Sequence, residues 1–141
     1  MFAGNQNKKV SIEDFTLITV LGKGSYAKVL LVKKKSDGRI FAMKVIKKKE
    51  NSDKNTQKQH EHIITERNVL VGLNHQFICK LFYSFQNDRK FFFTLEYCPG
   101  GELFNLLVKK KRFSEDQTRF YAAQIILALE HVHSLDVIYR E

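Results

Sequence analysis

The stretch LGKGSYAKVLLV (residues 21–32) decides the fold of this 141-residue chain. It continues the β-branched and aromatic run FTLITVL (15–21), which predicts a strand, and its own apolar second half predicts another. IFAMKVI (40–46) predicts a third strand, joined to the second by a Ser-Asp-Gly turn (36–38). Because strands with short connections usually pair with their neighbours, we predict an antiparallel meander.

The rest of the chain predicts one helix, two more strands and two further helices. Their residue ranges are 57–73, 81–85, 91–97, 102–108 and 114–133. Ser114 and Gln117 have the spacing of a capping box, in which each side chain bonds the backbone of the other residue. We therefore predict an α+β fold, with a five-stranded antiparallel sheet and one helix followed by two more helices.

The composition is typical of a globular protein. Apolar residues make up 43% of the chain, with 12 Phe and 5 Tyr. The longest apolar runs fall far short of the roughly 20 residues that span a bilayer, and the N-terminus lacks the apolar stretch of a secretion signal. Cys79 and Cys98 lie 19 residues apart without a CxxC motif, which indicates reduced thiols. We expect a cytoplasmic or nuclear protein with no membrane span.

The net charge of +9 is concentrated in the first 50 residues, which hold 12 Lys/Arg against 4 Asp/Glu. Such a block attracts nucleic acid, acidic lipid or a polyphosphate ligand. A solvated lysine-rich face is the simpler interpretation, and the run 91–93 (Phe-Phe-Phe) fits strand core better than a platform for stacked bases. Nucleic-acid binding is therefore disfavoured, and strong salt dependence independent of ATP would be its mark.

Gly22, Gly24 and Ala27 have the spacing of two phosphate-binding motifs. In a dinucleotide-binding unit the motif opens a helix, and an acidic residue follows about 20 residues later. Here the strand-like AKVLLV (27–32) follows, and lysines occupy the place of the acid, which argues against that motif. The other motif is the glycine-rich flap between two strands that covers ATP in protein kinases. Small residues there let backbone N–H groups approach the phosphates.

A lysine and a glutamate extend this pattern. Lys44 shares one face of its strand with Ala42 and Ile46. Glu66 falls on the apolar stripe of the following helix with Ile63, where a carboxylate is costly unless a cation meets it. We predict a Lys44–Glu66 ion pair that holds the amine toward the α- and β-phosphates.

Together these motifs resemble the catalytic domain of a eukaryotic serine/threonine protein kinase. More narrowly, they resemble the AGC group, near the serum/glucocorticoid-regulated and protein kinase B branches. The segments that carry the resemblance are LGKGSYAKVLLV (21–32), IFAMKVIKK (40–48), HIITERNVL (62–70), LEYCPGGELF (95–104), RFSEDQTRFYAAQIILALEHVHS (112–134) and VIYRE (137–141). The resemblance implies an N-terminal extension (1–14), a kinase small lobe that binds the nucleotide (15–97), and a hinge with part of the large lobe (98–141).

The resemblance also implies a role for each matched residue. The flap that contacts ATP would consist of Leu21, Gly22, Lys23, Gly24, Ser25, Tyr26, Ala27, Lys28 and Val29. Val29 and Ala42 would enclose the adenine, and Lys44 and Glu66 would be the catalytic ion pair. The other implied roles are gatekeeper for Leu95, hinge hydrogen bonds to adenine from the backbone of Glu96 and Cys98, a ribose contact for Glu102, and a spine joining the lobes for Leu70, Leu81 and Tyr139.

The sequence departs from the family pattern at several positions. Ala27 replaces the third glycine of the flap, and Gln76 stands where a proline is usual. Glu141 stands at the position of the catalytic aspartate, and the resemblance stops there, just before the rest of the catalytic loop. ATP is the implied cofactor, with Mg²⁺ only in a full-length form, since its ligands come later in the family. We expect these 141 residues alone to be inactive.

The resemblance implies a protein substrate in a full-length form. Phe82 and Phe92 are candidates for the small-lobe groove that binds a hydrophobic tail or a regulator in AGC kinases. The alternative function is a non-catalytic module, a kinase remnant or pseudokinase that binds nucleotide or a partner. The five histidines have no zinc-type spacing with cysteine and predict no metal site.

Overall fold

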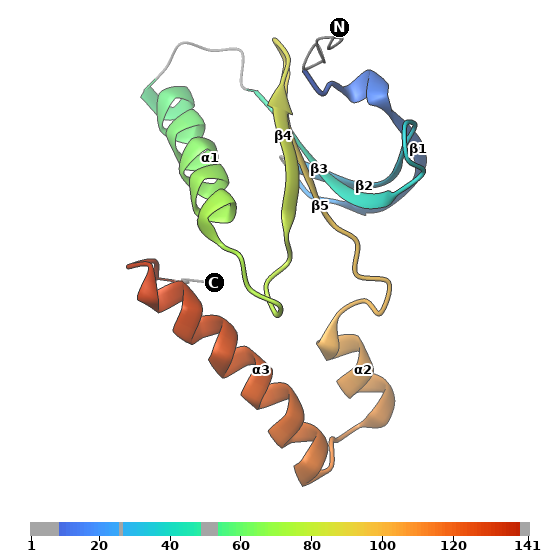
Figure 1. Cartoon of the computed structure of the whole chain (residues 1–141), viewed down its shortest axis with the longest axis vertical. Coiled ribbons are helices and arrows are strands. Elements are labelled where there is room, and N and C mark those ends of the chain that lie inside the picture. The colour runs from blue at the N-terminus through green and yellow to red at the C-terminus, as the bar shows by residue number, and fades with distance from the viewer. Residues whose placement is uncertain (1–8, 26, 49–53, 139–141) are drawn as a thin grey trace, which may run out of the picture.

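The computed structural model describes residues 9–25, 27–48 and 54–138. Its elements are η1 (Ile12–Asp14), β1 (Phe15–Lys23), β2 (Ala27–Lys34), β3 (Ile40–Lys47), α1 (Lys54–Gly72), β4 (Leu81–Gln86), β5 (Lys90–Glu96), α2 (Leu103–Lys110) and α3 (Glu115–Ser134). All strand pairs are antiparallel, in the order β1-β2-β3-β5-β4. Figure 1 shows α1 beside the sheet, with α2 and α3 below it. The predicted α+β fold is confirmed.

Local hydrogen bonds set the two hairpin turns. Gly38 has φ of 73°, in the left-handed region that glycine adopts without strain, and its N–H donates to the Lys34 carbonyl at 2.9 Å. In the β4–β5 turn, the Asn87 side-chain oxygen accepts from the backbone N–H groups of Arg89 and Lys90 at 3.0 and 2.8 Å. The predicted turn at 36–38 is therefore present, and a second turn joins β4 to β5.

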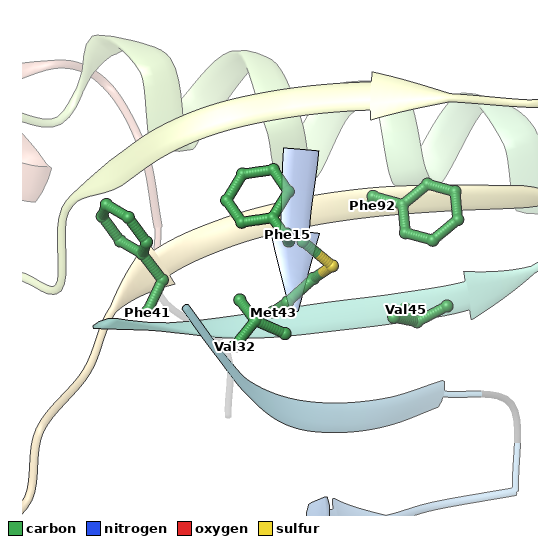
Figure 2. Close-up of a cluster of buried hydrophobic side chains, with 6 residues drawn as sticks. All are labelled: Phe15, Val32, Phe41, Met43, Val45 and Phe92. Atoms are coloured by element: carbon green, nitrogen blue, oxygen red, sulfur yellow. The ribbon is translucent and has the colours of Figure 1, made fainter. Parts of the chain in front are cut away.

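The sheet buries a separate apolar cluster on each face. Figure 2 shows the larger one, formed by Phe15, Val32, Phe41, Met43, Val45 and Phe92. The smaller one lies against α1 and contains Ile46, Ile63, Phe91 and Phe93. Successive residues of a strand point to opposite faces, so β3 and β5 contribute to both clusters. The three phenylalanines of β5 are thus strand core, as predicted.

The helices α2 and α3 lie apart from these clusters, and neither contains a buried residue. The predicted capping box opens α3: the Gln117 N–H donates to Ser114 Oγ at 3.2 Å, and the Ser114 N–H donates to Gln117 Oε1 at 3.3 Å. The rings of His75, in the loop before β4, and His131 of α3 stack with their centroids 5.2 Å apart, which connects α3 to the sheet-containing part of the molecule. Over the described ranges, no helix is both long and apolar enough to cross a bilayer.

Candidate functional site

The site is organised by one row of paired residues across the sheet. Gly22 of β1 pairs with Val29 of β2, which pairs with Lys44 of β3, which pairs with Phe93 of β5. Paired residues on neighbouring antiparallel strands project from the same face. Phe93 belongs to the cluster against α1, so the Lys44 side chain rises on the α1 side of the sheet, below the glycine of the flap.

The Lys44 amine meets the Glu66 carboxylate of α1, as the sequence predicts. Lys44 Nζ donates to Glu66 Oε1 at 2.5 Å, and the side chains are 31% and 40% exposed. Ile63, one turn earlier on α1, is buried in the cluster that contains Phe93, which fixes the helix against the sheet. The pair therefore lies at the rim of an apolar contact, with the lysine amine still accessible to a ligand.

The flap above this pair has room for a ligand near its backbone. The Gly24 N–H donates to the Ala27 carbonyl at 2.8 Å and closes the β1–β2 hairpin. A Cβ added at Gly22 would meet no atom within 4 Å, and neither Gly22 nor Gly24 has positive φ. These glycines are therefore not required by the turn geometry. Their lack of a side chain leaves the backbone open to close approach.

The flap's other residues divide between the sheet and solvent. Ala27 pairs with Ile46 and packs against the α1-side cluster, so its methyl group has an apolar contact that a third glycine would lack. The exposed residues are Leu21, Lys23, Ser25 and Lys28. Tyr26 lies outside the described residues, as do the two matched residues near the end, Tyr139 and Glu141.

An apolar strip lies next to Lys44 on the same face. Ala42 is paired with Leu31 on one side and Leu95 on the other, one pleat along from Val29 and Lys44. Val29, Ala42 and Leu95 are each half-buried. Small and apolar side chains beside a single amine suit a flat apolar ring that carries an anionic tail.

The segment after β5 supplies backbone groups at the end of this strip. The Glu96 N–H continues the sheet by donating to the Lys80 carbonyl at 2.9 Å, and Glu96 Oε2 accepts from the Lys80 N–H at 3.4 Å. The Cys98 carbonyl accepts from the Gly101 N–H at 3.3 Å, where Gly101 has φ of 73°. Glu102 is the N-cap residue of α2, and its exposed side chain makes no capping bond.

Comparison with known families identifies this arrangement. The family model described as "Protein kinase domain" matches residues 15–141. The chain belongs to the protein kinase family. The flap, the Lys44–Glu66 pair and the apolar strip correspond to the kinase small lobe, whose lysine and helix glutamate form an ion pair. The β3 lysine of this chain stands in the sequence Ala-Met-Lys (42–44), where the kinase motif has Ala-Ile-Lys.

Curated relatives are serine/threonine kinases of the AGC group. The chain is 48% identical over 136 residues to a RAC family serine/threonine-protein kinase homolog of Dictyostelium discoideum, covering 96% of this chain and 30% of the relative. It is 46% identical over 136 residues to the human serine/threonine-protein kinase Sgk2, covering 96% and 36%. It is 43% identical over 133 residues to the mouse RAC-beta serine/threonine-protein kinase, covering 94% and 27%. The chain thus spans about a third of the length of these relatives, and the resemblance to both branches is confirmed.

A hollow of this kinase lobe lies between α1, the segment 9–11 and strands β4 and β5. It has a volume of about 730 Å³ and is bounded by the segment 9–11, by Ile64 and Arg67 of α1, and by residues of β4 and β5. Phe82 lines it, and the predicted role of Phe82 in binding a hydrophobic tail stays a prediction. The prediction for Phe92 is wrong, because this side chain faces the opposite side of the sheet and is buried in the larger cluster. Phe91 and Phe93, which alternate with it, line the hollow instead.

Two features of the lobe had no signal in the sequence. Arg67, next to Glu66, donates from Nε to Ser84 Oγ of β4 at 3.1 Å, which ties α1 to the edge of the sheet. Cys79, just before β4, donates from its thiol to the Glu96 carbonyl at 3.4 Å. Both contacts depend on how β4 is placed in the sheet, which local patterns do not reveal.

The residues present fit ATP, the cofactor that the family uses. The open backbone at Gly22 and the accessible amine of Lys44 suit phosphate oxygens, and the strip beside Ala42 suits adenine. If bound here, ATP would supply the phosphoryl group, and Lys44 and the flap backbone would be the groups placed to orient it and to balance its charge. Within the described ranges no cluster of three His, Cys, Asp or Glu side chains is placed to hold a metal ion.

Proposed function

We propose that this chain binds ATP between the β1–β2 flap and the face of β3 and β5. In a full-length form it would transfer the γ-phosphate of ATP to serine or threonine of a protein substrate. The single observation that carries the proposal is the Lys44–Glu66 contact beside an apolar strip and below an unobstructed glycine. The curated relatives are named serine/threonine-protein kinases, which supports the same activity.

Each part of the site has a proposed task. Lys44 bonds the α- and β-phosphates while Glu66 holds its amine in place. Val29 and Ala42 contact the two faces of adenine, and Leu95 limits the depth of the pocket as gatekeeper. Beyond these, backbone groups of Glu96 and Cys98 bond the adenine edge, Glu102 contacts the ribose, and the flap residues 21–28 cover the phosphates.

We propose that these 141 residues by themselves bind nucleotide without transferring phosphate. In protein kinases the catalytic aspartate belongs to the loop H-R-D-L-x-x-x-N, whose asparagine holds magnesium, and the DFG aspartate that also holds magnesium follows later. Residue 141 is matched to the aspartate position of that loop, and it is a glutamate. The alternative is that the chain acts as a binding module, docking a hydrophobic segment in the hollow lined by Phe82.

Nucleotide binding tests the proposal directly. The chain is titrated with ATP and, separately, with adenosine, and the heat of binding is measured by calorimetry. We expect saturable binding of both, with ATP tighter because only ATP reaches the Lys44 amine. Absence of saturable ATP binding at millimolar concentrations would contradict the proposal. Phosphoryl transfer is then measured with a generic basic peptide, and turnover by these 141 residues alone would contradict the inactivity of the isolated segment.

A further inference from the structure

The two cysteines of the chain lie at neighbouring strand ends. Leu81 of β4 pairs with Leu95 of β5, and the hydrogen bond from Glu96 N–H to the Lys80 carbonyl extends this pairing by one residue. If the pairing continues by one more residue, Cys79 lies opposite Tyr97, which directly precedes Cys98 in the chain. Cross-strand and diagonal neighbours in such a ladder lie within reach of each other's side chains.

The two thiols lie close together at this position. The Cys79 thiol donates to the Glu96 carbonyl at 3.4 Å, two residues before Cys98, and the Cys98 side chain is near enough to raise the pKa of Cys79. Both cysteines are exposed and free. Oxidants therefore have access to a pair of thiols that are already adjacent, although 19 residues separate them in the sequence.

We propose that Cys79 and Cys98 are a redox modification site, which peroxide closes to an intrachain disulfide across the ends of β4 and β5. The Cys98 sulfur attacks one oxygen of hydrogen peroxide, the O–O bond breaks, and water leaves once the hydroxide takes a proton. The Cys79 sulfur then attacks the resulting sulfenic acid, its S–O bond breaks, and a second water leaves. Two thiols lose two electrons to one peroxide, and a thiol reductant reverses the change.

The order of these steps follows from the surroundings of the two sulfurs. Partial burial of its thiol, together with the charges of Cys98 and Glu96, raises the pKa of Cys79 to about 11. Little Cys79 thiolate is therefore present at neutral pH, and thiolate is the form that attacks peroxide. Cys98, on the exposed segment after β5, is the first to react, and Cys79 is the resolving thiol.

Closure of the disulfide changes the segment that we assign to adenine. This consequence rests on the proposed function. The bridge removes the Cys79 thiol proton that bonds the Glu96 carbonyl and ties Cys98 to β4. Glu96 and Cys98 are the two residues whose backbone is proposed to meet the adenine edge, so the oxidised chain should bind ATP about tenfold more weakly than the reduced chain.

The test oxidises the reduced chain with limiting hydrogen peroxide and measures intact mass. We expect a loss of about 2 Da, both thiols blocked together, a linked peptide containing Cys79 and Cys98, and a rate that does not depend on protein concentration. In Cys79→Ser, Cys98 should stop at sulfenic acid and be trapped by dimedone. In Cys98→Ser, Cys79 should stay largely reduced under the same conditions.

Three results would overturn the proposal. These are intermolecular dimers as the main product, irreversible oxidation of Cys98 without the linked peptide, or equal dimedone trapping in the wild-type chain and Cys79→Ser. Calorimetry with ATP on reduced and oxidised chain then tests the consequence, and equal affinity would refute the effect on the hinge. If the reduced chain binds no ATP, the proposed function fails, while the mass measurement alone still decides the disulfide.

Discussion

Replacing Lys44 by methionine should separate the phosphate-binding role of the site from its apolar role. The substitution removes the amine that lies 2.5 Å from Glu66 Oε1 and leaves an unbranched side chain of similar shape. Ala42 and Val29 are unchanged beside it. We therefore expect Lys44→Met to weaken ATP binding and to leave adenosine binding nearly unchanged.

The size of the effect follows from the surroundings of the pair. A hydrogen bond to a charged group contributes about 1.5–3 kcal/mol, which is a factor of roughly 10 to 150 in Kd for ATP. The Lys44 and Glu66 side chains are 31% and 40% exposed. Water therefore screens their attraction, which contributes at most about 1 kcal/mol to the free energy of unfolding. The loss of ATP affinity should therefore exceed the loss of stability.

Calorimetric Kd values for ATP and adenosine, with urea unfolding on each variant, measure both quantities. Lys47→Met is the matched control, since it removes the same charge from β3 at an exposed position on the opposite face. Glu66→Gln should weaken ATP binding by less, about 3- to 10-fold, and the double variant should be no weaker than Lys44→Met alone. Glu61→Gln, at an exposed position on α1, controls for the loss of a carboxylate.

Two results would refute this reasoning. One is an ATP affinity of Lys44→Met equal to that of Lys47→Met, which would mean that the amine does not contact the phosphates. The other is an equal loss of ATP and adenosine binding, which would mean that the substitution disturbs the sheet rather than the ligand contact. Additive effects of Lys44→Met and Glu66→Gln would show that the two side chains act independently.

Three further predictions concern the sheet, the last helix and the Cys79 thiol. Met43→Ala, at a fully buried position, should lower the free energy of unfolding in urea by about 2–5 kcal/mol, whereas Val71→Ala, at a 60% exposed position, should change it by less than about 0.5 kcal/mol. Ser114→Ala should remove the capping bond of α3 at a cost of about 1 kcal/mol, seen as earlier loss of helical circular dichroism on heating. Alkylation of Cys79 by iodoacetamide, followed by peptide mass spectrometry, should reach half its maximal rate near pH 11, because the raised pKa keeps the thiol protonated up to that pH.

The parts of the fold that could be predicted from the sequence are those that local chemistry determines. Gly38 and Asn87 mark turns because their backbone or side chain satisfies the turn's hydrogen bonds. Ser114 and Gln117 mark the start of α3 for the same reason. These signals need no knowledge of the rest of the molecule.

The Lys44–Glu66 contact is the exception, a long-range pair that the sequence does predict. It is recognisable because Glu66 interrupts the apolar stripe of α1, and a carboxylate at that place requires a cation. Ile63, which shares this stripe with Glu66, is buried, whereas Leu70, one turn after Glu66 on α1, is only half-buried. The helix is therefore fixed by fewer apolar contacts than the stripe suggests, and the ion pair is one of its ties to the sheet.

Strand ends and strand order were beyond local patterns. β1 extends to Lys23, past the end of the predicted strand at Leu21, because Gly22 pairs with Val29 and so continues the ladder. The interior position of β5, between β3 and β4, has one signal in retrospect, since Phe91–Phe93 is a continuous rather than an alternating apolar run. The error for Phe92 arose because alternation along β5 divides these three residues between opposite faces.

The arrangement of β3 explains how an open site is held in place. Met43 and Val45, on either side of Lys44, are buried in the larger cluster on the opposite face. Since a strand alternates its side chains, anchoring these two residues fixes the direction in which Lys44 leaves the sheet. The amine thus remains accessible to a ligand while its backbone has little freedom. Removing the amine in Lys44→Met should lower the affinity for ATP, whereas truncating the buried side chain in Met43→Ala should lower the stability of the fold. The two variants should therefore have separable effects although the residues are adjacent.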